Sequence, residues 1–423
     1  MINDVNELIA LIEGSKRQEK KTSLEKMSSL CSLFGNPEIG VPFIHVGGTN
    51  GKGSTVTYIK SILMEAGFNV GSFISPYVVC FNERISVNND YISDDDLLKY
   101  GNLVIDKCKD NNLDLPAFFD FITIIAFLYF KDLYLAKKVD FVVLEVGMGG
   151  IYDSTNVCSP LVSIITNVDY DHMSILGNSL EEIWQNKLGI LKPNTPFICF
   201  KSKYDDLVIS RAKEQKSFGK LRLVNKDSCS NVRIINNQTI FDYLGTKDYK
   251  INLLGKYQAE NACLAIEAIN ILNEVLDLNI KLDVVRAGLL NAFWPGRLEM
   301  VSENPLVFLD GAHNVDAINR LYEFIKMYKF KKPLRLVIAI SANKEVEKMI
   351  KIIEPLASEV IYSQFNYKRS DTACHLYELS NHPKKKLMEN EDQIKDYIMA
   401  DKKHDNILFG SLYFVSEMRK KFK

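Results

Sequence analysis

Apolar runs of strand length alternate along the chain with amphipathic stretches of helix length. The runs at 43–46 and 139–146 are nearly continuous, as expected of parallel strands buried on both faces. Between them, residues 54–66 carry apolar side chains at spacings of three and four, which predicts a helix. Further apolar runs of strand length lie at 70–74 and 161–165. This alternation predicts a doubly wound α/β domain with a mostly parallel sheet.

The pattern changes twice toward the carboxyl end. Residues 201–252 form short, polar, β-leaning pieces, which predict strands at the edge of the first domain. Pro295 and Gly296 end a helix, and beyond them the alternation begins again. The later elements are strands at 306–309, 334–340, 360–362 and 407–408, and helices at 317–327 and 346–355. We therefore predict a first domain of residues 1–295 and a smaller, Rossmann-like α/β domain of residues 296–423.

A glycine-rich segment, Gly47-Gly-Thr-Asn-Gly-Lys-Gly53, joins the first apolar run to the first helix. A strand, a glycine turn and a helix N-terminus present backbone N–H groups and a positive dipole end to an anion. Lys52 adds a charge and Ser54 a hydroxyl group for a metal ion. The segment thus predicts a P-loop-type triphosphate site made by Asn50, Gly51, Lys52, Gly53 and Ser54. The general P-loop pattern has a glycine in place of Val46 and a hydroxyl in place of Gly53, so an ordinary glycine-rich turn is the alternative.

Three polar residues close or follow other predicted strands. They are Ser75, Glu145 and His172. Ligands of open α/β sheets bind outside the carboxyl ends of the strands, which brings such residues to one edge. A hydroxyl, a carboxylate and an imidazole, completed by water and phosphate oxygens, predict a Mg²⁺ site. Each residue alone has a structural explanation, since a glutamate at a strand end is often a helix-cap partner.

Composition narrows the class of protein. The chain has 423 residues, 47% apolar and 25% charged, with a formal net charge of −1. This is typical of a globular protein of two or three domains and gives no reason to expect a nucleic-acid or membrane partner. Eight scattered cysteines without a Cys-x-x-Cys pair indicate a reducing compartment. Residues 1–12 carry no basic signal, and the apolar run at 121–130 is too short to span a bilayer. We expect a soluble, cytoplasmic monomer.

Short segments along the whole chain together resemble the folylpolyglutamate synthases and dihydrofolate synthases of the Mur ligase family. The loop form Gly-Thr-Asn-Gly-Lys-Gly-Ser at 48–54 is typical of them. The other segments are 81–85, 144–150, 153–156, 171–172, 187–192, 295–297, 310–314 and 410–413. Residues 22–27 resemble a further segment near the start of the family, from which Ser23 and Lys26 depart.

The resemblance implies roles for particular residues. It implies Mg²⁺ ligands at Ser75, Glu145 and His172. It implies ATP contacts at residues 50–53, Asn261, Arg297 and Asp310. It implies a pterin pocket beside Phe119, Asp120, Tyr152, Asp153 and Ser154. From position alone, Phe119 and Asp120 would be a core residue and a helix-dipole partner. Ile151 stands where many relatives have arginine, a change that could alter the preferred form of folate.

The implied chemistry is ATP-driven amide formation. The γ-phosphoryl group converts a carboxylate to an acyl phosphate, a step that needs mainly positioning and charge neutralisation, here by Lys52 and Mg²⁺. The amine of L-glutamate then attacks with the help of a base, for which Asp310 and His313 are candidates. His313 and Ser411 both follow strands of the second domain, so we expect glutamate to bind at that edge. We expect the site to be complete only when the domains close and exclude water.

Lys187 has two interpretations. It could be an exposed helix lysine, which composition alone favours. However, its segment closely follows Asp171-His172, and like charge beside Mg²⁺ would lower the pKa of an ammonium group. A neutral amine can take up CO₂ to form a carbamate, and the resemblance points to the same modification. The hypothesis is that Lys187 is carbamylated and helps to hold the metal.

We therefore predict a two-domain, ATP- and Mg²⁺-dependent ligase that adds L-glutamate to a folate, to dihydropteroate or to both. One alternative is a ligase that adds amino acids to cell-wall nucleotide precursors, which the segment at 81–85 and the delayed Ser54 oppose. The other is a nucleotide-binding module that hydrolyses ATP without ligation. It would leave the segments at 310–314 and 410–413 unexplained. Bifunctionality and the length of the polyglutamate product are left open.

Overall fold

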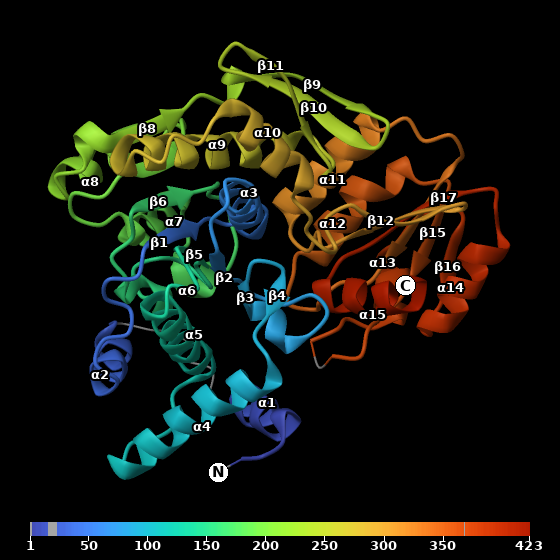
Figure 1. The fold of residues 1–423 in the computed structure, drawn as a ribbon. Coiled ribbons are helices and arrows are strands. Elements are labelled where there is room, and N and C mark those ends of the chain that lie inside the picture. Colours follow the sequence, from blue (N-terminus) through green and yellow to red (C-terminus); the bar gives the residue numbers. More distant parts are fainter. Residues whose placement is uncertain (1, 16–22, 368) are drawn as a thin grey trace. The chain divides into compact units, whose positions relative to one another are not determined.

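The computed structural model describes residues 2–15, 23–367 and 369–423 (Figure 1). The family-like segment at 22–27 begins at Thr22, which lies outside the described residues. Backbone contacts divide the chain into two compact units. The first unit comprises the residues up to Cys229 together with Glu260–Asn291, and the second comprises Ser230–Ala259 together with Ala292–Lys423. A domain boundary between 295 and 296 stays a prediction.

The first unit contains an eight-stranded sheet in the order β4-β3-β2-β5-β1-β6-β7-β8. The strands are β1 Phe43–Gly47, β2 Val70–Phe73, β3 Ile85–Val87, β4 Asp90–Tyr91, β5 Phe141–Glu145, β6 Val162–Ile165, β7 Phe197–Phe200 and β8 Leu221–Val224. Six of them pair in parallel, and β3 and β4 form an antiparallel edge. This confirms the predicted mostly parallel sheet.

The helices of this part of the chain precede, connect or follow the strands. They are α1 Val5–Gly14, α2 Glu25–Leu33, α3 Lys52–Glu65, α4 Asp94–Asp110, α5 Phe118–Leu135, α6 Met173–Leu176, α7 Leu180–Lys187, α8 Asp205–Glu214, α9 Lys256–Leu276 and α10 Leu282–Asn291. The apolar helix α5 packs directly on the strands, with the Phe127 ring 5.6 Å from that of Phe43 on β1. Helix α3 begins two residues before Ser54, because Gly51 adopts the left-handed conformation (φ 85°) and ends the loop there.

The prediction for residues 201–252 was wrong for most of the segment. Residues 205–214 form α8, and only β8 joins the edge of the first sheet. Strands β9 Cys229–Ile235, β10 Gln238–Tyr243 and β11 Thr246–Ile251 form a separate antiparallel sheet, which belongs from Ser230 onward to the second unit. Two tight turns with positive φ angles, at Asn236-Asn237 and Leu244-Gly245, connect these strands as hairpins.

The second unit also contains a six-stranded sheet in the order β12-β13-β17-β14-β15-β16. Its strands are β12 Glu299–Glu303, β13 Leu306–Asp310, β14 Leu334–Ile338, β15 Glu359–Tyr362, β16 Lys385–Leu387 and β17 Asp405–Phe409, and only β12 runs antiparallel. Helices α11 Val315–Met327, α12 Val346–Ile353 and α13 Ala373–Leu379 share one apolar cluster, and α14 Glu391–Ala400 and α15 Leu412–Phe422 share the other. These are the two faces of the predicted smaller α/β fold.

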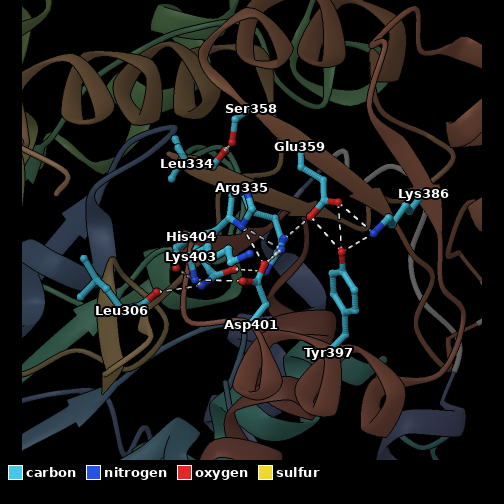
Figure 2. A network of polar contacts seen from close by, with 11 residues as sticks. Leu306, Leu334, Arg335, Ser358, Glu359, Lys386, Tyr397, Asp401, Lys403 and His404 are labelled. Atoms are coloured by element: carbon cyan, nitrogen blue, oxygen red, sulfur yellow. Dashed lines mark hydrogen bonds and ion pairs between the residues drawn. The ribbon is translucent and has the colours of Figure 1, made fainter. Parts of the chain in front are cut away.

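A buried arginine ties together the amino-terminal ends of three strands of this sheet (Figure 2). Arg335 on β14 is fully buried and pairs with Glu359 on β15 and with Asp401 after α14. Its guanidinium also donates to Asn406 on β17 at 3.2 Å and lies 4.6 Å from the centre of the Tyr397 ring. The network is at the end of the sheet opposite to the carboxyl ends of the strands, so it supports the fold rather than the ligand edge.

No helix in the described part of the chain is both long enough and apolar enough to cross a membrane.

Candidate active site

The glycine loop is held by the segment that follows the neighbouring strand β6. The backbone N–H of Asn50 donates to the side chain of Asn167 at 2.7 Å, and Thr166 Oγ1 donates to the carbonyl of Asn50 at 2.6 Å. Gly48 has φ 145°, and a Cβ atom there would lie 2.0 Å from Thr166 Oγ1, so only glycine fits. The sequence prediction named the loop but missed Thr166 and Asn167, for which the only signal was their place at a strand end.

Two lysine side chains converge on one carbonyl of this loop. Lys52 Nζ lies 3.3 Å from the carbonyl oxygen of Gly48 and 3.1 Å from that of Thr49, and Lys187 Nζ lies 2.9 Å from the same oxygen of Gly48. Lys187 is the last residue of α7 and only 3% exposed, so the interpretation as an exposed helix lysine was wrong. Burial, and next the charge of Lys52, lower the pKa of Lys187 to about 7.

Two other predicted ATP-site residues lie on helices next to the glycine loop. Ser54 is buried in the first turn of α3. Asn261, on α9, is buried against the loop, since a Cβ atom on Gly51 would lie 2.4 Å from its Oδ1. The structure therefore places the predicted ATP residues of the first unit around one helix N-terminus.

The parallel sheet brings the predicted metal residues to one edge. Strands β2, β5, β1 and β6 are neighbours, and Ser75, Glu145 and His172 close or follow three of them. The backbone N–H of Ser75 donates to Glu145 Oε2 at 3.2 Å, so these two residues are in contact. His172 adopts φ 50° at the start of α6, and its half-exposed ring lies 3.9 Å from Asp171. No group of three His, Cys, Asp or Glu side chains within the described residues is close enough to form a metal site unaided.

The predicted acceptor residues also meet. Ser154 Oγ donates to Asp120 Oδ1 at 2.6 Å, and both residues are buried. The Phe119 ring packs 5.8 Å from that of Phe73 and so close to Gly147 that a Cβ atom there would be 2.4 Å away. Asp153 is buried and caps the short 3₁₀ helix Ser154–Val157, whereas Tyr152 is 38% exposed. The first turn of α5 therefore lies against the segment that follows β5.

In the second unit, the carboxyl ends of β13 and β17 carry the remaining predicted residues. Asp310 ends β13, and its two carboxylate oxygens accept hydrogen bonds from the N–H groups of Leu298 and Ala312, both at 2.9 Å. Burial raises the pKa of Asp310 above its usual value, against the opposing effects of the Arg297 charge and of these hydrogen bonds. The Arg297 side chain lies over Gly311, where a Cβ atom would be 2.6 Å from its guanidinium.

His313 and Ser411 lie just beyond the same two strands. His313 Nδ1 is 2.8 Å from the carbonyl oxygen of Gly311, which can only accept, so Nδ1 carries the proton. Ser411 follows β17 and caps α15 through a 3.2 Å hydrogen bond from the N–H of Tyr413 to its hydroxyl group. A Cβ atom on Gly311 would be 2.4 Å from Leu412, so the loops after β13 and β17 are in contact.

Comparison with known proteins identifies the family. The Mur ligase middle domain matches residues 123–269, and the dihydrofolate synthetase C-terminal domain matches residues 297–421. The dihydrofolate synthase/folylpolyglutamate synthase of Bacillus subtilis strain 168 is 36% identical over 426 residues, which cover 97% of this chain and 97% of that protein. The chain belongs to the dihydrofolate synthase/folylpolyglutamate synthase family.

Solved structures of folylpolyglutamate synthases have the same fold. The apo form of the Lacticaseibacillus casei enzyme is similar with a TM-score of 0.87 at 27% identity, over 99% of both chains. A folylpolyglutamate synthase in complex with AMPPCP and folate has a TM-score of 0.84 at 28% identity, again over 99% of both chains. The family, the α/β fold and the ligase class that the sequence motifs predict are thereby confirmed.

Proposed function

We propose that the chain adds L-glutamate to a folate acceptor in an ATP- and Mg²⁺-dependent reaction through an acyl phosphate. The observation that carries this proposal is the convergence of Lys52 and Lys187 on the carbonyl of Gly48, at the N-terminus of α3. The charge of Lys52 beside the glycine loop and the dipole at the N-terminus of α3 suit a triphosphate, and Lys187 lies at the same carbonyl. A related synthase binds AMPPCP and folate together, which supports the same pair of ligands here.

The residues at the sheet edge fit a magnesium ion. Ser75 offers a hydroxyl oxygen and Glu145 a carboxylate, the hard oxygen donors that Mg²⁺ prefers, and the two residues are already in contact. Ser54 and His172 are the further ligands that we assign from the sequence. When bound, Mg²⁺ would neutralise phosphate charge during phosphoryl transfer. Ser75 and Glu145 would orient it, and Lys52 would hold the transferred group.

We assign Lys187 a carbamate. The Lys187 amine is buried and donates to the carbonyl of Gly48. Burial and the charge of Lys52 lower its pKa to about 7, against the smaller opposing effects of Asp171 and Asp153. The neutral form reacts with CO₂ to give a carbamate and a proton. The product replaces a buried cation beside Lys52 with an anion, which removes the repulsion between the two ammonium groups and leaves two oxygens suited to Mg²⁺.

The second unit supplies the glutamate site in this proposal. Both oxygens of Asp310 already accept backbone hydrogen bonds, so Asp310 suits anchoring of the loop and of Arg297 better than proton abstraction. Nδ1 of His313 donates to Gly311, which leaves Nε2 as the nitrogen that accepts a proton in the neutral ring. We therefore favour His313 over Asp310 as the base or as the ligand of the glutamate amine, with Ser411 beside it.

The same proposal describes a monomeric cytoplasmic enzyme without a nucleic-acid partner, with the ATP-binding domain at 1–295 and the glutamate-binding domain at 296–423.

A non-ligating ATPase is the second candidate, because the phosphate loop alone would suffice for it. The family relationship and the acceptor residues Asp120 and Ser154, which meet beside the loop after β5, favour the ligase.

Release of ADP distinguishes these candidates. The purified protein is given MgATP and L-glutamate, with dihydropteroate, tetrahydrofolate or no acceptor. We expect ADP release to require an acceptor and the Lys52→Ala variant to release none. Equal ADP release with and without acceptor would identify an ATPase and defeat the ligase. The two acceptors separate dihydrofolate synthase from folylpolyglutamate synthase activity.

A single substitution tests the assignment of the glutamate site. His313→Ala should raise the KM for L-glutamate by about tenfold or more, the cost of one charge-assisted hydrogen bond. The KM for ATP should change by less than about twofold, because we place ATP phosphates at the first unit. Initial rates with each substrate varied in turn give both constants. Equal shifts in the two constants would contradict separate sites.

A further inference from the structure

A buried histidine on β1 joins the phosphate-loop strand to the acceptor side of the site. His45 is fully buried, two residues before Gly47, and faces the segment after β5. Its Nε2 lies 2.8 Å from Thr155 Oγ1, across 110 residues of sequence. The sequence did not single out His45, because a lone histidine in an apolar strand is ordinarily a core residue, and Thr155 stood only within the family-like segment at 153–156.

The direction of these hydrogen bonds follows from the partners. Thr155 Oγ1 lies 2.5 Å from Asp153 Oδ1, and a carboxylate oxygen only accepts, so the hydroxyl proton goes to Asp153. The hydroxyl oxygen must then accept from His45, which places the proton of the ring on Nε2. Nδ1 of His45 is buried without a hydrogen-bond partner among the described residues, as a neutral ring allows. Burial, and next the charge of Lys192, lower the pKa of His45 to about 3, so the ring stays neutral.

Asp153, in turn, is hydrogen-bonded to the glycine segment after β5. Its Oδ2 accepts from the N–H of Met148 at 2.9 Å, and its Oδ1 accepts from the N–H of Thr155 at 3.0 Å. Met148 lies between Gly147, which touches Phe119, and Gly149. Ser154, the next residue after Asp153, donates to Asp120. One chain of hydrogen bonds therefore runs from β1 to the loop and the side chains that we assign to the acceptor.

We propose that His45 and Thr155 are positioning residues that orient Asp153 and the segment 147–150 for binding of the folate acceptor. The inference rests on the proposed function, and it adds two residues to it. His45 supplies the donor that prevents the Thr155 hydroxyl from turning away from Asp153. Thr155 supplies a side-chain donor to Asp153, beside the backbone donors of Met148 and Thr155. Neither residue needs to touch a substrate.

Paired substitutions separate positioning from simple loss of packing. Thr155→Val keeps the shape of the side chain and removes the hydroxyl group, whereas Thr155→Ser keeps the hydroxyl. His45→Leu removes the donor, whereas His45→Gln offers an amide N–H in a similar place. Thr195→Val is the matched control, because Thr195 is also buried in the first unit and its hydroxyl group donates to the carbonyl of Pro193, outside this chain of hydrogen bonds.

We expect Thr155→Val and His45→Leu to raise the KM for the acceptor by about tenfold, the effect of one lost hydrogen bond to a charged group. The KM for ATP should change less than about twofold, and Thr155→Ser, His45→Gln and Thr195→Val should stay close to the unaltered protein. A structural role through β1 would instead disturb the adjoining phosphate loop, so that both constants rise together. That result, or equal behaviour of Thr155→Val and Thr155→Ser, would overturn the proposal.

A measurement independent of activity tests the hydrogen-bond chain itself. The chain has six histidines, so ¹⁵N-histidine labelling gives few signals, and His45→Gln assigns the one that disappears. We expect His45 to show a neutral ring protonated at Nε2, and the Thr155→Val variant to shift that signal. A ring protonated at Nδ1 would overturn the assigned direction. The unaltered protein could instead show the Nε2-protonated ring but add no glutamate to any acceptor. In that case the proposed function would fail, while the hydrogen-bond chain would be supported.

Discussion

Each unit of the protein contains a fully or almost fully buried cation, and the two have opposite surroundings. Arg335 in the second unit is matched by Glu359 and Asp401 and is further bound by Asn406. Lys187 in the first unit donates to the carbonyl of Gly48, and the largest charge effect on it comes from Lys52, against the smaller effects of Asp171 and Asp153. A buried charge is costly unless it is paired. The paired cation therefore belongs to the fold, and the poorly paired one indicates a functional site.

The position of each cation in its sheet agrees with this difference. Arg335 lies at the amino-terminal ends of the strands, where its network links β14, β15 and the segment before β17 (Figure 2). Lys187 lies at the loop that follows a carboxyl end, where ligands of α/β sheets bind. The same replacement at each position should thus have opposite consequences, and methionine is suitable because it is unbranched, apolar and of similar length.

The largest effect is expected from Lys187→Met. Glutamate-dependent ADP release should fall by about 10²- to 10³-fold, because loss of one preorganised group that stabilises charge in the transition state has effects of this size. In the smaller variant Lys187→Ala, formate or acetate should restore part of the activity by taking the place of a carbamate. Rates with and without the added carboxylate provide the measurement.

The stability of the Lys187→Met variant should differ from its activity. Lys187→Met should unfold in urea at the same concentration as the unaltered protein or at a higher one, because it removes a poorly paired buried amine. A large loss of stability with little loss of activity would reverse the comparison. Electron density for an unmodified Lys187, with Mg²⁺ and nucleotide bound, would contradict the carbamate hypothesis.

Arg335→Met should act on stability. Removal of one partner from a buried ion network leaves Glu359 and Asp401 uncompensated, which typically destabilises by about 3–5 kcal/mol. Urea unfolding followed by circular dichroism measures this loss. At a temperature where the variant is folded, its KM for ATP should match that of the unaltered protein. Arg335→Lys, which keeps the charge but cannot bind two carboxylates in the same way, is the control and should lose less.

The smallest effect is expected in the pH dependence of the stability difference between the unaltered protein and Arg335→Met. Burial alone would raise the pKa of Asp401, but hydrogen bonds from the N–H of Lys403, from Arg335 and from His404 outweigh it and lower that pKa below its usual value. The pKa of Glu359 is also lowered, by Lys386 and Arg335 against the effect of burial. A lowered folded-state pKa gives stability that is present above the unfolded value and lost as the pH falls through the folded one.

The stability gap between the unaltered protein and Arg335→Met should therefore narrow from pH 6 to pH 3. Urea midpoints at several pH values give the gap, and the comparison cancels the contribution of other carboxyl groups that both proteins share. A constant gap over this range would show that the carboxylates do not owe their lowered pKa values to Arg335.

The sequence by itself determined the features that depend on neighbours along the chain. The apolar runs placed β1, β2, β5 and β6, because strands buried on both faces require continuous apolar residues. The glycine segment placed the phosphate loop, because few other residues permit its backbone. The rule for strand ends then placed Ser75 beside Glu145 without any knowledge of the sheet order.

Contacts between distant segments were decided only by the tertiary structure. The residues that bind the carbonyl of Gly48 include Lys187, 139 positions away, and the side chain that fixes Thr155 belongs to His45, 110 positions away. The hairpins of β9–β11 have a pattern that fits either unit, and only packing assigns them to the second. Periodicity reports which face of an element is buried but not what lies against that face. The environment that distinguishes Lys187 from an ordinary helix lysine therefore exists only in the folded chain.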